Sequence, residues 1–186
     1  MKNLIQKKKN SGFTIIEVMI VLAIAGLIMV IVFLAVPALQ RNQRDNARQS
    51  IVNRLSAELT TYAGNNQGTY PFGTTAHPPS SGSGSWSDFF NRYISGKVNI
   101  KDPSTGNDVF TANAGGNCVG TGNAVCPFNA GSITPPTVTG AAEVVYGAKC
   151  NGESYQASGS PNVTARTFAI LIGLDRAGTV YCVDNG

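Results

Sequence analysis

Residues 7–39 read KKKNSGFTIIEVMIVLAIAGLIMVIVFLAVPAL, and this stretch sets the organisation of the whole chain. A lysine run ends before Gly12, and the 27 residues from Phe13 to Leu39 contain a single charged side chain, Glu17. As a helix, these residues extend about 40 Å, which exceeds the roughly 30 Å hydrocarbon core of a bilayer. The stretch therefore predicts a membrane-spanning helix.

The position of the charges predicts how this helix is oriented. The chain has 186 residues and a formal net charge of +4, and the four lysines of residues 1–12 account for that charge. A product that begins at Phe13 is therefore formally neutral. Lysines on the amino side of a span stay in the cytoplasm, so the carboxyl-terminal part is expected to be exported. A secretory signal has a shorter apolar core with its cleavage site after it, whereas Gly12 precedes the apolar segment here.

Glu17 needs an explanation, because a charged side chain within a membrane helix costs roughly 2.5 to 3.5 kcal/mol on insertion scales. One explanation is local: Thr14-x-x-Glu17 fits a capping box, in which Thr14 caps the helix and Glu17 bonds the first amide. The other is an ion pair with a cation, which apolar surroundings strongly favour.

The run Lys7-Lys8-Lys9-Asn10-Ser11-Gly12-Phe13-Thr14-Ile15-Ile16-Glu17 closely resembles the processing site and helix start of type IV prepilins, a family that includes pilins and the pseudopilins of type II secretion. The resemblance implies that a prepilin peptidase cuts after Gly12, that the Phe13 amine is methylated, and that Glu17 pairs with the free amine of a neighbouring subunit. It also implies three kinds of assembly partner: identical subunits in a helical filament, a pilus assembly ATPase and a membrane platform protein.

Beyond Gln40 the apolar residues become periodic, with spacings of three and four in Ala47, Ile51, Leu55, Leu59 and Tyr62. The helix is therefore expected to continue with one apolar stripe against the chain's own globular domain, and to end at Gly64 to Gly68. Pro37 is expected to kink or loosen it. Four segments follow: a cleaved leader at 1–12, a transmembrane or filament-core helix at 13–39, an amphipathic half at 40–64, and an exported domain at 65–186.

The exported domain is expected to be rich in β-strands, which makes the predicted fold class α+β: a long N-terminal helix packed on a C-terminal antiparallel sheet, as in pilins. A short helix is expected at Asp88–Ser95, capped by Ser87. Residues 113–140 are rich in Gly, Asn, Thr and Pro and are expected to lack regular structure. Strands are expected in two places within 97–112, around a turn at Asp102–Asn107, and at Glu143–Ala148, Arg166–Leu174 and Thr179–Val183, the last two joined by a hairpin turn at 175–178.

Four cysteines lie in the exported domain: Cys118, Cys126, Cys150 and Cys182. An even number in an oxidising compartment predicts two disulfides, for which three pairings exist. We favour Cys118 with Cys126 and Cys150 with Cys182; buried free thiols are the alternative. The sequence contains no C-x-x-C and one histidine, His77, so zinc is not expected, and Asp102 and Asp108 are interpreted as turn residues rather than calcium ligands.

No enzyme motif is present, because the sequence contains no G-x-S-x-G, H-E-x-x-H or P-loop, and no cofactor is expected. The leading hypothesis is a structural subunit of a type IV pilus, held in the cytoplasmic membrane before assembly into an extracellular filament for adhesion, motility or DNA uptake. A minor pilin or a type II secretion pseudopilin is the alternative. A third hypothesis is an uncleaved, membrane-anchored binding module. Residues 65–186 carry six basic and seven acidic side chains, which argues against nucleic acid as a partner.

Overall fold

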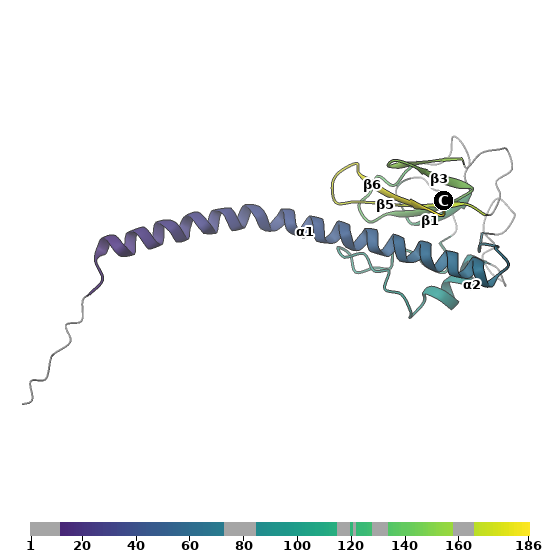
Figure 1. Cartoon of the computed structure of the whole chain (residues 1–186), viewed down its shortest axis with the longest axis horizontal. Coiled ribbons are helices and arrows are strands. Elements are labelled where there is room, and N and C mark those ends of the chain that lie inside the picture. Colours follow the sequence, from purple (N-terminus) through teal and green to yellow (C-terminus); the bar gives the residue numbers. More distant parts are fainter. Residues whose placement is uncertain (1–11, 73–84, 115–119, 121, 128–133, 158–165) are drawn as a thin grey trace, which may run out of the picture. The chain divides into compact units, whose positions relative to one another are not determined.

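The computed structural model describes residues 12–72, 85–114, 120, 122–127, 134–157 and 166–186. The chain divides into two compact units, Met1–Gln40 and Arg41–Gly186. The predicted α+β fold class is confirmed, because one long helix precedes a β-rich domain (Figure 1).

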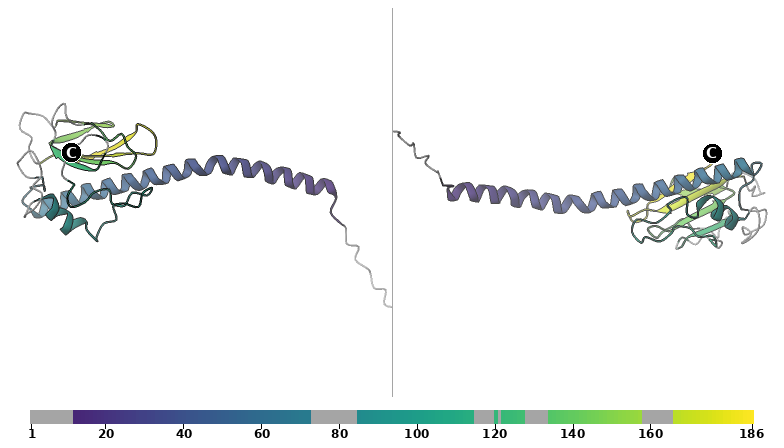
Figure 2. Two further views of the ribbon diagram at one scale, coloured as in Figure 1. Left: turned by 180° about the vertical axis from the view of Figure 1, so that it is seen from behind. Right: turned by 90° about the horizontal axis from the view of Figure 1, so that it is seen from below.

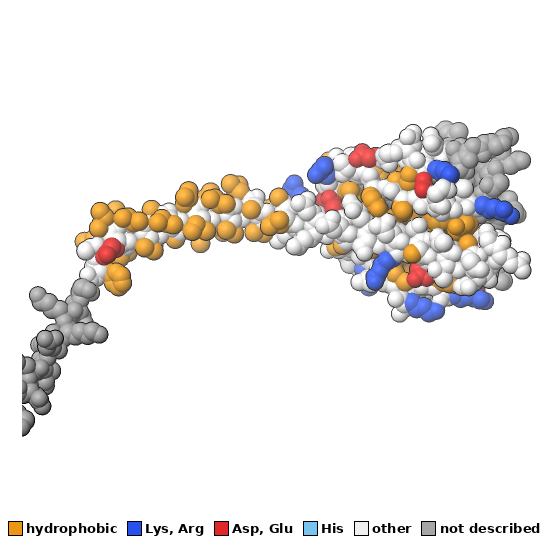
Figure 3. Space-filling view, viewed as in Figure 1, with side chains coloured by type: hydrophobic (Ala, Val, Ile, Leu, Met, Phe, Trp, Pro, Cys, Tyr) orange, Lys and Arg blue, Asp and Glu red, His pale blue; other side chains and the backbone are white. Residues whose placement is uncertain are grey.

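Helix α1 (Ile15–Asn65) begins in the first unit and contributes its second half to the second. An 18-residue window near its start has a mean hydropathy of 3.2, and none of that window is buried. Figure 3 shows hydrophobic side chains along this part of the helix. By length and composition it can cross a membrane. The α-helix continues through Pro37 without ending there, so the proline does not break it.

The second half of α1 buries one stripe of side chains against the β-sheet (Figure 2). This stripe contains Val52, Leu55 and Leu59, which are fully buried, together with Ile51 and Tyr62. The helix ends where Gln67 and Gly68 adopt positive φ angles of 57° and 78°, and the Gly68 amide donates to the Ala63 carbonyl at 2.8 Å. This is a C-cap of the kind that glycine favours.

Among the described residues, the main sheet has four strands in the order β1-β2-β5-β6, and a separate hairpin pairs β3 with β4. The pairs β2–β5 and β5–β6 are antiparallel, whereas β1 runs parallel to β2. The predicted antiparallel sheet is confirmed for β2, β5 and β6, and β1 adds a parallel edge strand to it. The strands are β1 (Ala124–Pro127), β2 (Ala142–Tyr146), β3 (Ala148–Asn151), β4 (Ser154–Ala157), β5 (Phe168–Gly173) and β6 (Val180–Asp184).

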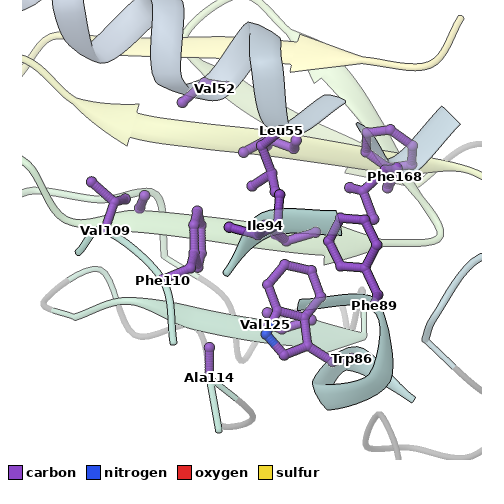
Figure 4. Close-up of a cluster of buried hydrophobic side chains, with 14 of the residues drawn as sticks. Val52, Leu55, Trp86, Phe89, Ile94, Val109, Phe110, Ala114, Val125 and Phe168 are labelled. Carbon is purple, nitrogen blue, oxygen red and sulfur yellow. The ribbon is translucent and has the colours of Figure 1, made fainter. Parts of the chain in front are cut away.

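Successive side chains of a strand point to opposite faces, so β2 contributes to two cores. Val144 and Tyr146 lie in the core shared with α1, which also contains Trp86 and Phe89 (Figure 4). Val145 lies in a second core on the other face, beneath the β3–β4 hairpin, with Leu171 and other small or apolar residues. The sheet is thus covered by α1 on one face and by the β3–β4 hairpin on the other.

Several local predictions need correction. The two strands expected within 97–112 are absent from this described segment, which forms only an isolated bridge between Lys101 and Asp108 around the predicted turn. The strand expected at Glu143–Ala148 is divided at Gly147, whose φ of 76° ends β2 before β3 begins. Strand β1 lies within 113–140, where no regular structure was expected, and its parallel partner β2 is distant in sequence.

The short helix is also different from its prediction. It consists of α2 (Trp86–Phe89) followed by the π-helical turn η1 (Phe90–Ile94). Its N-cap is Ser85, whose hydroxyl accepts from the Asp88 amide at 3.1 Å, and not Ser87. Ser85 directly precedes Trp86 whereas Ser87 follows it, so a cap at Ser85 places the buried Trp86 in the first turn of the helix. The predicted hairpin turn at 175–178 is confirmed, because β5 and β6 pair on either side of it.

Candidate processing and assembly site

The expected cleavage position lies on exposed backbone just before α1. Gly12 and Phe13 precede the helix, which begins at Ile15, and Phe13 is 90 % exposed. No heavy atom lies within 4 Å of the position that a Cβ on Gly12 would occupy. A peptidase can therefore approach the Gly12–Phe13 bond without displacing any described part of the chain. Lys7, Lys8 and Lys9 lie outside the described residues.

Thr14 and Glu17 form the capping box that their spacing predicts. Glu17 Oε2 accepts from the Thr14 amide at 2.8 Å and from the Thr14 hydroxyl at 2.8 Å. The Glu17 amide in turn donates to Thr14 Oγ1 at 3.4 Å. Two of the amides that a helix start leaves unpaired are satisfied in this way. The local explanation of Glu17 is therefore present in the structure.

The capping box gives Glu17 hydrogen bonds but no counter-charge. The side chains around it on the helix surface, including Val18 and Val21, are apolar and exposed. Within the described part of the chain, no ion pair joins Glu17 to a cation. A carboxylate in apolar surroundings is stabilised most by a cationic partner. The capping box supplies no cation, so a cation from another chain can still pair with Glu17.

Comparison with known proteins identifies a family signature in the sequence around this site. Residues 7–33 match the family model described as the prokaryotic N-terminal methylation motif. The chain carries the type IV prepilin leader signature. No curated protein and no solved structure matches the chain.

The prepilin signature spans the features that the sequence singled out. The matched residues begin in the lysine run, include Gly12, Phe13 and Glu17, and continue to Phe33 within the apolar helix. The motif therefore supports the interpretation of the chain as a type IV pilin-like or pseudopilin precursor. Its motif and its apolar helix together support membrane anchoring before assembly.

The second unit, Arg41–Gly186, is cross-linked by disulfides. Cys150 and Cys182 are bonded, with their Cα atoms 5.9 Å apart, and join β3 to β6. This agrees with the favoured pairing. Cys126, on β1, is also disulfide-bonded, and its predicted partner Cys118 lies outside the described residues. No described cysteine is a free thiol, so that alternative is not supported.

A buried charge cluster that the sequence did not predict joins α1 to two loops of the second unit. Arg48 is fully buried, and its guanidinium donates to Asp102 Oδ2 at 2.7 Å, to Asp175 Oδ1 at 2.7 Å and to Ser104 Oγ at 2.6 Å. Arg48 lies three and four residues before Ile51 and Val52, and that spacing is the signal that places it on the buried face of the helix.

The cluster controls the protonation of its members. Burial alone lowers the pKa of Arg48, but hydrogen bonds and charges from Asp102 and Asp175 outweigh it and raise this pKa. Burial alone raises the pKa of Asp102, but Arg48 and the amides of Ser104 and Thr105 outweigh it and hold the pKa below its usual range. Asp102 therefore has the turn role predicted for it, together with an ion pair. Among the described residues, no group of His, Cys, Asp and Glu is arranged to hold a metal ion.

Proposed function

We propose that this chain is a structural subunit of a type IV pilus. In this proposal a prepilin peptidase cuts after Gly12, the new Phe13 amine is methylated, and the subunits polymerise through their N-terminal helices into an extracellular filament for adhesion, motility or DNA uptake. The observation that carries the proposal is the match of residues 7–33 to the methylation motif, at the start of an apolar helical segment, residues 15–39, whose side chains are all exposed.

The exposed helix explains why assembly needs Glu17. Moving such a helix from lipid into a bundle of like helices exchanges one apolar environment for another, so the hydrophobic effect supplies little driving force. Packing between helices and polar contacts must provide it instead. A cationic amine on Phe13 of one subunit and Glu17 of its neighbour form a pair that is worth most in the water-free core of a filament.

The surface of the exported unit supports a place on the outside of the filament. Among its described residues, the one large hydrophobic side chain that is exposed is Val138, at 47 %. Soluble exteriors avoid large apolar patches, whereas buried contact surfaces display them. Together with the Cys150–Cys182 disulfide, this polar surface is suited to an extracellular environment.

Minor pilins and type II secretion pseudopilins are expected to share the leader and the helix, so their distinction from a major pilin is one of abundance and location. Shearing the cells and identifying the main component of the released fibres tests this directly. The proposal expects this chain, with an amino terminus at Phe13 by mass spectrometry. Fibres that contain it only in traces would indicate a minor subunit or pseudopilin, and an intact Met1 terminus would indicate an uncleaved anchored module.

A further inference from the structure

Glu143 is a carboxyl group placed in an apolar core of the exported unit. It lies on the central strand β2, pairs with Ala124 of β1 and Leu171 of β5, and is fully buried. Strand alternation directs its side chain to the same face as Val145, away from α1 and beneath the β3–β4 hairpin. An ionised carboxylate is expensive at such a position unless it is paired and hydrogen-bonded.

The partners of Glu143 are too few to compensate a full charge. Its Oε1 accepts from the Gly120 amide at 2.8 Å, and its buried Oε2 has no hydrogen-bond partner among the residues that the structure describes. The residues that line this face from β1, β3 and β5 include Ala124, Ala148 and Leu171, which are apolar. From β4 comes Tyr155, a titratable phenol whose pKa is raised by burial and by the charge of Glu143. No described cation pairs with Glu143.

The Gly120 amide links Glu143 to a second segment of chain. Gly120 has a φ of 77°, and its carbonyl accepts from the amide of Thr137 at 2.8 Å and from its hydroxyl at 3.1 Å. A Cβ on Gly120 would lie 2.8 Å from the Pro135 carbonyl oxygen. The backbone at Gly120 is therefore held between the Glu143 carboxyl group on one side and residues 135–137 on the other.

The same segment has a second attachment that does not involve Glu143. The Gly140 amide donates to the Gly173 carbonyl at 2.9 Å, and the Gly173 amide donates to the Ala141 carbonyl at 2.9 Å. These bonds fix the segment to the end of β5. Residues 135–140 are thus held at one end through Gly120 and Glu143, and at the other end by these backbone bonds and by the Thr139 hydroxyl, which donates to the Leu174 carbonyl at 3.1 Å.

We propose that the protonation state of Glu143 controls the contact that holds Gly120 and Thr137 on the sheet. The neutral carboxyl group lies in the apolar core at little cost and keeps its bond to Gly120. The ionised group needs water that the closed core does not supply, so ionisation favours opening of the Gly120 and Thr137 contacts. The Gly140 end stays closed in both states.

The pKa of Glu143 in the closed and open states determines the direction of the pH effect on opening and the pH range in which it occurs. Burial raises its pKa from the usual 4.5 to about 7 in the closed state, although the Gly120 bond opposes this rise. A carboxyl group that opening exposes to water has a pKa close to the usual value. Opening therefore becomes easier as the pH rises from about 4.5 to about 7 and levels off above that range.

Amide hydrogen exchange of the full chain in detergent micelles tests this inference. Protection of the Gly120 and Thr137 amides, corrected for intrinsic exchange, is expected to fall roughly tenfold or more between about pH 5 and about pH 7.5, whereas that of Gly140 stays constant. In Glu143→Gln, which keeps an acceptor for Gly120 without a titratable charge, protection is expected to be independent of pH. Glu153→Gln, at an exposed acid in the β3–β4 turn, should retain the wild-type behaviour.

Two results would overturn the proposal: constant protection of Gly120 and Thr137 in the wild type, or an unchanged pH dependence in Glu143→Gln. A second measurement covers the case in which that variant does not fold. The carboxyl carbon resonance of Glu143 in the wild-type chain should titrate near pH 7, and a midpoint near 4.5 would contradict the inference.

Discussion

Arg48 Nε donates to Asp102 Oδ2 across 2.7 Å, and this buried contact joins helix α1 to a turn 54 residues further along the chain. Asp102 Oδ1 accepts from the amides of Ser104 and Thr105 at 2.8 and 3.1 Å, so the acid shapes its turn while it neutralises the arginine. Asp175, in the β5–β6 hairpin, bonds the same guanidinium. One arginine thus fixes the helix to two separate loops of the exported unit.

Replacing Arg48 with alanine is expected to lower the free energy of unfolding of the second unit by about 3 to 5 kcal/mol, because it leaves the buried Asp102 without its cation and leaves Asp175 with Arg44 alone. Arg48→Lys should recover only part of this, since an ammonium cannot reproduce the planar fork. Denaturant unfolding of the full chain in detergent measures the effect. Arg54→Ala, at an exposed position on the same helix, is the control, and equal losses in the two alanine variants would contradict this role for Arg48.

The same cluster predicts acid sensitivity. The pKa of Asp102 and that of Asp175 are held below their usual value because, despite burial, hydrogen bonds and charges from Arg48 and its neighbours favour the ionised form. Depressed carboxyl pKa values contribute stability above the unfolded-state pKa, and this stability is lost as the pH falls below about 4. Asp102→Asn should therefore be less stable at neutral pH and lose less on acidification. A melting temperature that falls equally steeply in the variant would exclude Asp102 as a source of the acid sensitivity.

Glu143 makes folding stability depend on pH in the opposite direction from Asp102 and Asp175. Burial raises the pKa of Glu143 from 4.5 to about 7. The contribution of Glu143 to folding stability is therefore complete below its unfolded-state pKa and is lost as the pH rises through its folded-state pKa. Glu143→Gln removes the charge and should stabilise the chain at pH 8 by up to about 3 kcal/mol, with little effect near pH 5. Thermal unfolding at the two pH values measures this. A variant that is equally or less stable than the wild type at pH 8 would show that the buried charge is compensated.

Gly140 lies directly against the Asp102 carboxylate. Its φ is 76°, and a Cβ at this position would lie 2.6 Å from Asp102 Oδ2. Gly140→Ala should therefore displace Asp102 from Arg48 in addition to straining the backbone. Gly178 provides a matched control, because its φ is also 76° but no atom lies within 4 Å of its Cβ position. Gly178→Ala should cost about 1 kcal/mol and Gly140→Ala clearly more; equal costs would mean that Asp102 adjusts freely.

The parts of the fold that the sequence predicted are those with local, periodic signals. The stripe of Leu55 and Leu59 recurs at helical spacing, and the hairpin at 175–178 joins two strands that are adjacent in the chain. Strand β1 was missed because its parallel partner β2 begins 18 residues later, and because a Gly- and Asn-rich context hides a strand of four residues. Pairings between distant segments have no local signature.

The functional residues likewise include some with a local sequence signal and some without one. Thr14 and Glu17 could be paired from their spacing, because a capping box is a local motif. The cluster around Arg48 could not be predicted from spacing, since its acids come from residues 102 and 175 and meet only in the folded domain. Glu143 was included in a predicted strand without a role, because its burial depends on a hairpin that covers the far face of the sheet.

Substitutions of Glu17 separate its two roles. Glutamine keeps an oxygen that can accept from the Thr14 amide, as Glu17 Oε2 does at 2.8 Å, but it carries no charge. Valine removes both the charge and the acceptor. If the carboxylate pairs with the Phe13 amine of a neighbouring subunit, both variants should insert into the membrane and both should be lost from sheared filaments. If capping alone is required, Glu17→Gln should assemble and only Glu17→Val should fail.

Membrane fractionation and quantification of sheared fibres give the two readouts. Glu58→Gln removes a charge from the same helix beyond its apolar segment, and it should leave both insertion and assembly unchanged. Removing the Glu17 charge should make insertion easier, because a charged side chain costs roughly 2.5 to 3.5 kcal/mol in a membrane helix. A defect confined to the fibre fraction would therefore place Glu17 in assembly, whereas normal filaments from Glu17→Val would remove the electrostatic step from the proposed mechanism.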